Sequence, residues 1–132
     1  SAGELAKSRQ EHTATLLQDG RVLVVGGRGK RKEAEIYDPT TNSWTLAGET
    51  QRGRGELSAA LLADGRVLIV GGTGNTDITD IYDPAINTWV AGPNMNEGRI
   101  RLPIVALNDG RVIIPGGNGK SGLLASTEIF VP

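Results

Sequence analysis

The chain has 132 residues, of which 38% are hydrophobic and 22% charged, and its formal net charge is −1. This composition is typical of a folded globular protein, and so small a net charge gives no reason to expect nucleic acid as a partner. The lack of cysteine excludes disulfides, thiolate metal sites and cysteine nucleophiles, and a single histidine excludes a multi-histidine metal site within one chain, so we predict no metal and no cofactor.

Four short strands, A to D, are predicted in the first third of the chain, over residues 13–17, 21–25, 35–37 and 43–46. Asp19-Gly20 lies between strands A and B, and an Asp-Gly pair in that setting is typical of a type I′ hairpin turn. Strand B is apolar on both faces, which indicates burial on both sides. Gly26-Gly27 ends strand B, and residues 38–42 have the composition of a turn. No window has a helical period, so no α-helix is predicted, and no apolar run is long enough to span a membrane.

The same elements recur 45 residues later. Residues 54–92 are identical to residues 9–47 at 20 of 39 positions, far above chance. The matched motifs are Asp19-Gly20-Arg21 with Asp64-Gly65-Arg66, Gly26-Gly27 with Gly71-Gly72, Tyr37-Asp38-Pro39 with Tyr82-Asp83-Pro84, and Trp44 with Trp89. A period of this length is typical of propellers and solenoids.

A third copy departs from the pattern. It keeps the Asp-Gly-Arg and Gly-Gly motifs, but three extra residues precede Ile129, and Phe130 takes the place of the tyrosine. Pro132 corresponds to Pro39, so this copy lacks strand D and its tryptophan. Pro115 replaces a valine of strand B, where we expect a bulge or an unpaired position because proline donates no hydrogen bond.

These motifs resemble the kelch repeat, in which an arginine, a glycine doublet, a tyrosine and a tryptophan follow in order: Arg9, Gly26-Gly27, Tyr37 and Trp44, then Arg54, Gly71-Gly72, Tyr82 and Trp89. The resemblance implies an all-β fold of kelch-type β-propeller blades, each a four-stranded antiparallel meander with strand A innermost. It implies that Tyr and Trp fill the space between blades. It leaves function open, because kelch propellers serve many unrelated roles. The chain also resembles the kelch domain of the galactose oxidase family, but the Cys and His residues of a copper site are missing, which excludes that activity.

We predict one partial propeller over the whole chain. Its parts are blade 1 at about 7–48, blade 2 at about 49–93 and blade 3 at about 94–132, the last without its outer strand.

Three blades leave two sheet faces without a neighbour, so strand B residues such as Val22, Val24 and Ile113 should contact water. Natural propellers have about four to eight blades. Two chains joined head to tail give six, so the predicted partner is a second copy, and the chain is half of a six-bladed propeller. Other assemblies, and a ring completed by a different protein, are the alternatives.

Arginine recurs before strand A of each blade, at Arg9, Arg54 and Arg99. If strand A is innermost, these side chains ring the channel mouth, where with Arg101 they form a candidate anion site for an acidic peptide or a small anion. The structural alternative is pairing with the glutamates two residues further on, Glu11 and Glu56, which Arg101 replaces in blade 3.

Charges are predicted to separate between the two faces of the disc. The face of the D–A and B–C loops is net positive and includes the basic run at residues 28–32, for which a solvated loop is the alternative to a nucleic-acid or acidic-protein contact. No aromatic residues interleave with this run, which disfavours nucleic acid. The opposite face is net negative and is assigned Glu35, Asp80 and Glu128. His12 is predicted to be a packed or hydrogen-bonded strand residue rather than a catalyst.

Three functions are compatible with these features. The first is a non-catalytic scaffold or interaction module that self-assembles and binds acidic ligands at the Arg-lined mouth. The second is an engineered or excised half-propeller with no natural ligand. The third is a hydrolase or lyase acting at the mouth, which would need two carboxylates within about 10 Å. No pair of carboxylates can be assigned as acid and base from spacing, so we predict no catalytic residues and no enzyme.

Overall fold

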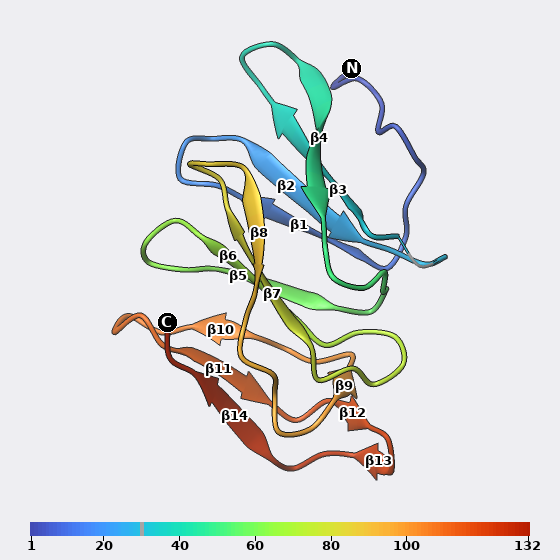
Figure 1. Ribbon diagram of the computed structural model, residues 1–132, viewed down its shortest axis with the longest axis vertical. Helices are drawn as coiled ribbons and strands as arrows, with labels where there is room; N and C mark the ends of the chain where they lie inside the picture. The colour runs from blue at the N-terminus through green and yellow to red at the C-terminus, as the bar shows by residue number, and fades with distance from the viewer. Residues whose placement is uncertain (30) are drawn as a thin grey trace.

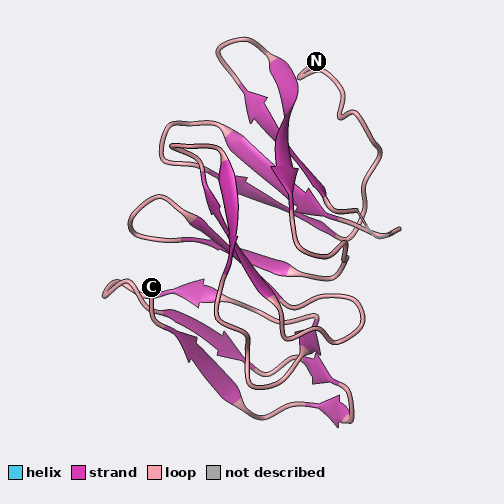
Figure 2. Ribbon diagram, in the orientation of Figure 1, coloured by secondary structure: helices cyan, strands magenta, loops and turns pink. Residues whose placement is uncertain are grey.

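The computed structural model describes residues 1–29 and 31–132, which form strands and loops with no helix (Figure 2). The predicted absence of α-helix is therefore confirmed for this part of the chain, and none of these residues belongs to a helix that could cross a membrane. Three main antiparallel sheets lie one beside the next in chain order along the longest axis of the molecule, and we call them blades 1, 2 and 3 (Figure 1).

Blades 1 and 2 are four-stranded meanders in which each strand pairs with its neighbour in sequence. Blade 1 comprises β1 (His12–Leu16), β2 (Val22–Gly26), β3 (Glu33–Asp38) and β4 (Ser43–Glu49), and blade 2 comprises β5 (Ser58–Leu61), β6 (Val67–Val70), β7 (Thr79–Asp83) and β8 (Thr88–Ala91). Strand β5 contacts β1 on one side and β10 on the other, which places strand A of each blade at a common inner edge.

The turn between β1 and β2 differs from the predicted type I′ turn. Gly20 has φ of +91°, but Asp19 has negative φ, and the Gly20 N–H donates to the Leu17 C=O at 3.0 Å. The hairpin is therefore closed by a turn that ends in one left-handed glycine, whereas type I′ needs two residues with positive φ.

Blade 3 has three strands, β10 (Val105–Ala106), β11 (Val112–Pro115) and β14 (Thr127–Phe130). A separate small sheet, which we did not predict, is formed by β9 (Arg99–Ile100), β12 (Asn118–Gly119) and β13 (Gly122–Leu123), the last two within the lengthened loop between β11 and β14. Pro115 pairs with Thr127 of β14, whereas the β10–β11 pairing ends at Ile113, so one side of Pro115 is unpaired as expected.

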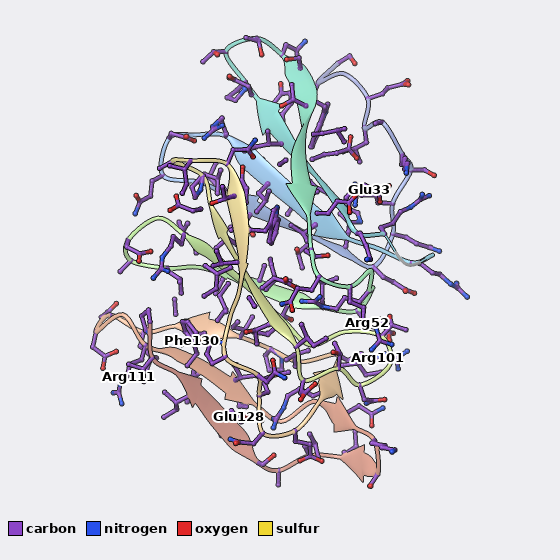
Figure 3. The ribbon with its side chains drawn as sticks, in the orientation of Figure 1. Glu33, Arg52, Arg101, Arg111, Glu128 and Phe130 are labelled. Atoms are coloured by element: carbon purple, nitrogen blue, oxygen red, sulfur yellow. The ribbon has the colours of Figure 1, made fainter. Side chains whose placement is uncertain are left out.

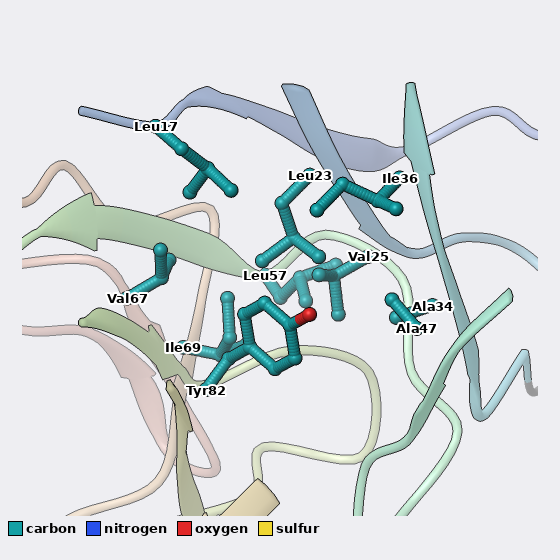
Figure 4. Packing of buried hydrophobic residues seen from close by; sticks show 10 residues of the cluster. All are labelled: Leu17, Leu23, Val25, Ala34, Ile36, Ala47, Leu57, Val67, Ile69 and Tyr82. Atoms are coloured by element: carbon teal, nitrogen blue, oxygen red, sulfur yellow. The ribbon is translucent and has the colours of Figure 1, made fainter. Parts of the chain in front are cut away.

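Apolar side chains fill both spaces between adjacent blades. The cluster between blades 1 and 2 contains Leu17, Leu23, Val25, Ala34, Ile36, Ala47, Leu57, Val67, Ile69 and Tyr82 (Figure 4). The cluster between blades 2 and 3 contains Ala60, Leu62, Leu68, Val70, Ile81, Met95, Leu102, Val112, Ile114 and Phe130. Strand β6 contributes alternate residues to the two clusters and is buried along its whole length, which explains why its sequence is apolar on both faces.

Each tryptophan links its blade to the chain segment on the preceding side. Trp89 packs against Tyr82, with ring centroids 4.9 Å apart and ring planes tilted by 38°, and donates its indole N–H to the C=O of Ala47 in β4, at 2.6 Å. Trp44 makes the same pair of contacts, with Tyr37 at 5.2 Å and with the C=O of Ala2 at 3.0 Å. The tryptophan of blade 2 thus lies between blades as predicted, and residues 1–3 occupy the place that the end of β4 has beside Trp89.

The glycine doublets allow adjacent backbones to approach closely. A Cβ on Gly26, whose φ is +76°, would lie 2.6 Å from the C=O oxygen of Arg54 in blade 2. The second glycine, Gly27, donates its N–H to that same oxygen at 3.0 Å. Blade 2 repeats this arrangement towards blade 3, where the Gly72 N–H donates to the Arg99 C=O at 3.0 Å.

The outward faces of blades 1 and 3 are exposed to different degrees. On blade 3, Val105 and Ile129 are 52% and 53% exposed, and Ile113 between them is half-buried. On blade 1, Val22 is half-buried and Leu16 exposed, but Val24 is 3% exposed, so the predicted contact of Val24 with water is wrong. The N-terminal segment covers part of this face, because the Ala6 N–H and the Arg9 side chain both bind Glu35 of β3, next to Val24 of β2.

Candidate binding face

An arginine–carboxylate ion pair occupies the same position in every blade. Each arginine precedes strand A and each carboxylate lies in strand C, with N–O distances of 2.9 Å in all three pairs: Arg9 with Glu35, Arg54 with Asp80, and Arg99 with Glu128. The arginine side chains are at most 1% exposed. Burial of a guanidinium is tolerated here because a carboxylate compensates its charge.

The same carboxylates also hold the chain that leads into each blade. The backbone N–H groups of Ala6, Gln51 and Asn96, each three residues before the arginine, donate to Glu35, Asp80 and Glu128 at 2.6, 3.1 and 2.7 Å. Each carboxylate therefore binds the segment that precedes strand A to the middle of strand C. The arginines that we predicted to ring the channel mouth thus position the loops of this face.

Two expectations about charge are corrected by these pairs. Glu35, Asp80 and Glu128 do not lie on the opposite face of the disc, because they extend from mid-strand to the arginines. The structural alternative, in which Arg9 and Arg54 pair with the glutamates two residues on, is also wrong, since they pair with Glu35 and Asp80. Glu56 instead pairs with Arg101 of the next blade, with 2.7 Å between Nε and Oε1.

The anion site predicted at Arg9, Arg54, Arg99 and Arg101 stays a prediction, with a changed geometry. Arg101 has a side chain that is 72% exposed, whereas the other three guanidiniums are buried and paired. Arg101 also lines a cavity of the described residues, together with residues from the loops of blades 1 and 2.

That cavity, of about 700 Å³, lies between blades 1 and 2 on the face of the D–A and B–C loops. Its charged lining consists of Glu11, Arg28, Lys32, Arg52, Arg54, Glu56 and Arg101. No described carboxylate lies within ion-pair distance of Arg28, Lys32 or Arg52, and all three residues are exposed. Since Asp80 compensates Arg54, the cavity keeps an excess of positive charge. Of the basic run at 28–32, Lys30 lies outside the described residues.

The sequence explains why Arg52 has no ion-pair partner among the described residues. The equivalent residue of blade 1, Lys7, pairs with Glu33 at 2.5 Å, and this bond lowers the pKa of Glu33 to about 2. In blade 2 the position of Glu33 is taken by Ile78, which cannot pair with Arg52. The single change from an acid to isoleucine therefore leaves a cation at the cavity.

The opposite edge of the molecule carries arginines of another kind. In the turns between strands A and B, Arg21, Arg66 and Arg111 each pair with the aspartate two residues earlier, with Nε or Nη2 to Oδ2 distances of 2.7 to 2.8 Å. Bonds from the side chain and backbone of Arg111 hold the pKa of Asp109 below its usual value. Figure 3 shows Arg52 and Arg101 near one another at one edge and Arg111 at the other.

The kelch motif profile matches residues 12–51 and 57–96, which is more than half of the chain. The chain belongs to the kelch-repeat family. A comparison with curated proteins finds no match. The two kelch motifs coincide with blades 1 and 2, and blade 3, with its longer loop and its phenylalanine in place of tyrosine, lies outside the matched residues.

Kelch repeats typically form non-catalytic interaction modules, and the described residues bring together no group of three or more His, Asp or Glu that could hold a metal ion. His12 is a strand residue as predicted, the first of β1, but it is exposed and therefore not packed as expected. Two residues of the cavity, Arg28 and Arg52, were not singled out individually from the sequence. The signal that could have found Arg52 is the loss of the acid at position 78.

Proposed function

We propose that this kelch chain is an interaction module that joins a second copy to form a six-bladed propeller and binds acidic ligands on the face of its D–A and B–C loops. The observation that supports assembly most directly is the unequal exposure of equivalent residues. Ile81 of blade 2 is 6% exposed, and its counterpart Ile129 in blade 3 is 53% exposed. Ile129 thus occupies a repeat position that is buried between blades in blade 2, but it is exposed in a single copy of the chain.

The two outward faces are complementary by their repeat positions. On blade 3, Val105, Ile113 and Ile129 are cross-strand partners in one row. On blade 1, Leu16 and Val22 are cross-strand partners whose equivalents in blade 2 face blade 1. Blade 3 of one copy against blade 1 of the next would therefore repeat the contacts already made between blades within the chain, and exposed apolar rows of this kind favour association.

Sedimentation velocity over a range of concentrations tests the assembly. Two chains of 13.9 kDa should give a species near 28 kDa, and the melting temperature should rise with protein concentration because folding and association are coupled. A stable 13.9 kDa monomer with a concentration-independent melt would contradict the two-copy ring. A defined mass of four or more chains would keep blade stacking but reject six blades.

The proposed ligand site is the cavity between blades 1 and 2. Arg28, Lys32 and Arg52 supply uncompensated charge, and Arg101 stands at its edge with Glu56 as a partner. Guanidinium groups bind carboxylate or phosphate with two parallel hydrogen bonds, so an acidic peptide or a small anion is the expected ligand. The buried arginines Arg9, Arg54 and Arg99 contribute by holding the loops in place.

Calorimetry with inorganic phosphate and with a glutamate-rich peptide tests this site. An Arg28→Gln, Arg52→Gln variant should bind more weakly than the wild type, and added salt should weaken binding in both. The matched control is Arg66→Gln, Arg111→Gln, which removes as much charge from the opposite edge. Equal phosphate affinity of the two double variants would reject the cavity as the anion-binding site. A wild-type chain that assembles but binds no anion would favour the half-propeller that has no natural ligand.

A further inference from the structure

One repeat position, held by Glu11, Glu56 and Arg101, lies where successive blades meet beside the cavity. These residues have φ of 58°, 51° and 50°, although none is glycine. Left-handed backbone disfavours residues with a Cβ and persists where the surroundings enforce it. The same conformation at three equivalent positions indicates that a repeated contact holds it.

That contact is a hydrogen bond from blade to blade. The Glu56 N–H donates to the Glu11 C=O at 3.0 Å, and the Arg101 N–H donates to the Glu56 C=O at 3.3 Å. Together with the bonds from Gly27 and Gly72 described above, both seams within the chain are built alike. A third seam of this kind would join the Arg101 C=O to the N–H of position 11 in the next blade.

The side chains at this position differ in charge along the chain. Blades 1 and 2 present glutamates, and blade 3 presents Arg101, whose Nε binds Glu56 at 2.7 Å. Because the Arg101 side chain is 72% exposed, its guanidinium has room for a second carboxylate. When blade 1 of a second copy follows blade 3, the residue placed next to Arg101 is Glu11 of that copy.

We propose that Arg101 directs the joining of copies by binding two carboxylates, Glu56 of its own chain and Glu11 of the second copy. This inference rests on the proposed assembly and adds an electrostatic selection of blade 3 against blade 1. In the closed ring each arginine at this position lies between two glutamates. The partner is therefore a blade that carries an acid at position 11, which the chain itself provides.

The test compares dimer dissociation constants by sedimentation velocity at low ionic strength. Arg101→Glu places like charges at both seams of the ring and should raise the dissociation constant by about tenfold or more. Adding Glu11→Arg restores an opposite pair across each seam and should recover most of that loss. Arg111→Glu, an exposed charge reversal at the opposite edge, is the matched control and should leave the constant unchanged.

Glu11→Arg alone keeps the Arg101–Glu56 pair within the chain and should still weaken assembly. The difference between Arg101→Glu and Arg111→Glu should shrink at high salt. If the wild type dimerises and the Arg101→Glu and Arg111→Glu variants have equal dissociation constants, the role of Arg101 is overturned and the proposed function is left intact. A wild-type chain that stays monomeric at every concentration would overturn both.

Discussion

Blades 2 and 3 are built from the same repeat but differ in how many neighbouring blades they have within one chain. All four residues of β6 in blade 2 are buried, whereas β11 in blade 3 alternates between buried and half-buried residues. The ion pair of blade 2 is 1% exposed on both side chains, and Glu128 of the pair in blade 3 is 11% exposed. Burial of equivalent residues is thus set by the neighbouring blade as well as by the repeat itself.

The difference separates two kinds of feature. Contacts within the turn between strands A and B, those of the Asp-Gly-Arg motif, are the same in all three copies. Contacts between blades are complete only around blade 2. Substitutions at equivalent positions in blades 2 and 3 therefore measure what a second neighbour contributes to stability.

The largest effect is expected at the buried ion pair of blade 2. Asp80→Asn leaves the Arg54 charge buried without compensation and should lower the free energy of unfolding by about 3–5 kcal/mol. Glu128→Gln is the matched change in blade 3 and should cost less, because water reaches that carboxylate. Urea unfolding at one fixed protein concentration measures both. Equal losses of unfolding free energy in the two variants would show that the second neighbouring blade does not affect the stability contributed by the ion pair.

The next effect concerns the apolar faces. Ile81→Ala removes a side chain from the cluster between blades 2 and 3 and should cost about 2–4 kcal/mol. Ile129→Ala should cost little in dilute protein and approach the cost of Ile81→Ala as concentration rises and the ring forms. Unfolding curves at low and high concentration give this comparison. A small and concentration-independent loss for Ile129→Ala would place that residue outside any interface.

A smaller effect is expected at the cavity. Ile78→Glu should give Arg52 the partner that Lys7 has in Glu33, and should lower phosphate affinity several-fold by compensating the cation. The introduced carboxyl should also titrate at a lowered pKa, as Glu33 does at about 2. Ile78→Gln is the neutral control, and NMR titration gives both quantities. If the introduced carboxyl has a lowered pKa but phosphate affinity is unchanged, Arg52 does not take part in phosphate binding.

The smallest effect is expected where the two blades do not differ. Arg66→Ala and Arg111→Ala break exposed pairs and should each shift the melting temperature by about 1 °C or less. The pKa of Asp109 is lower in the folded chain than in the unfolded chain. Its contribution to stability is therefore present above its pKa in the unfolded chain and is lost as pH falls through its pKa in the folded chain. NMR titration should show the pKa of Asp109 rising towards 3.8 in Arg111→Ala.

The repeat made most of the fold predictable from sequence. Strand order, the kelch blades and the absence of helix follow from motifs recurring at constant spacing, and the Gly-Gly doublets act as expected where backbones approach. The small sheet around β12 was not predictable from the repeat, because it lies in a loop that the other blades lack. The type of the Asp-Gly turn was wrong because residues beyond the pair take part in closing the hairpin.

The site was less predictable because long side chains reach across elements. Alternation along a strand places Glu35, Asp80 and Glu128 on a sheet but does not tell how far an arginine folds back towards them. Counting loop charges therefore assigned these acids to the wrong face. Pairing between Glu56 and Arg101 was also hidden, since residues 45 apart meet only when blades are adjacent.

The N-terminal segment has a consequence for how such a chain can be lengthened. Ala2 receives the Trp44 N–H as Ala47 receives that of Trp89, and the Ala6 N–H binds Glu35 as that of Gln51 binds Asp80. Residues 1–45 and 46–90 are therefore equivalent modules that share these two contacts at their boundaries. An in-frame duplication of residues 46–90 would add a blade that keeps these tryptophan and carboxylate contacts, so the number of blades can change without new contacts of these two kinds having to evolve.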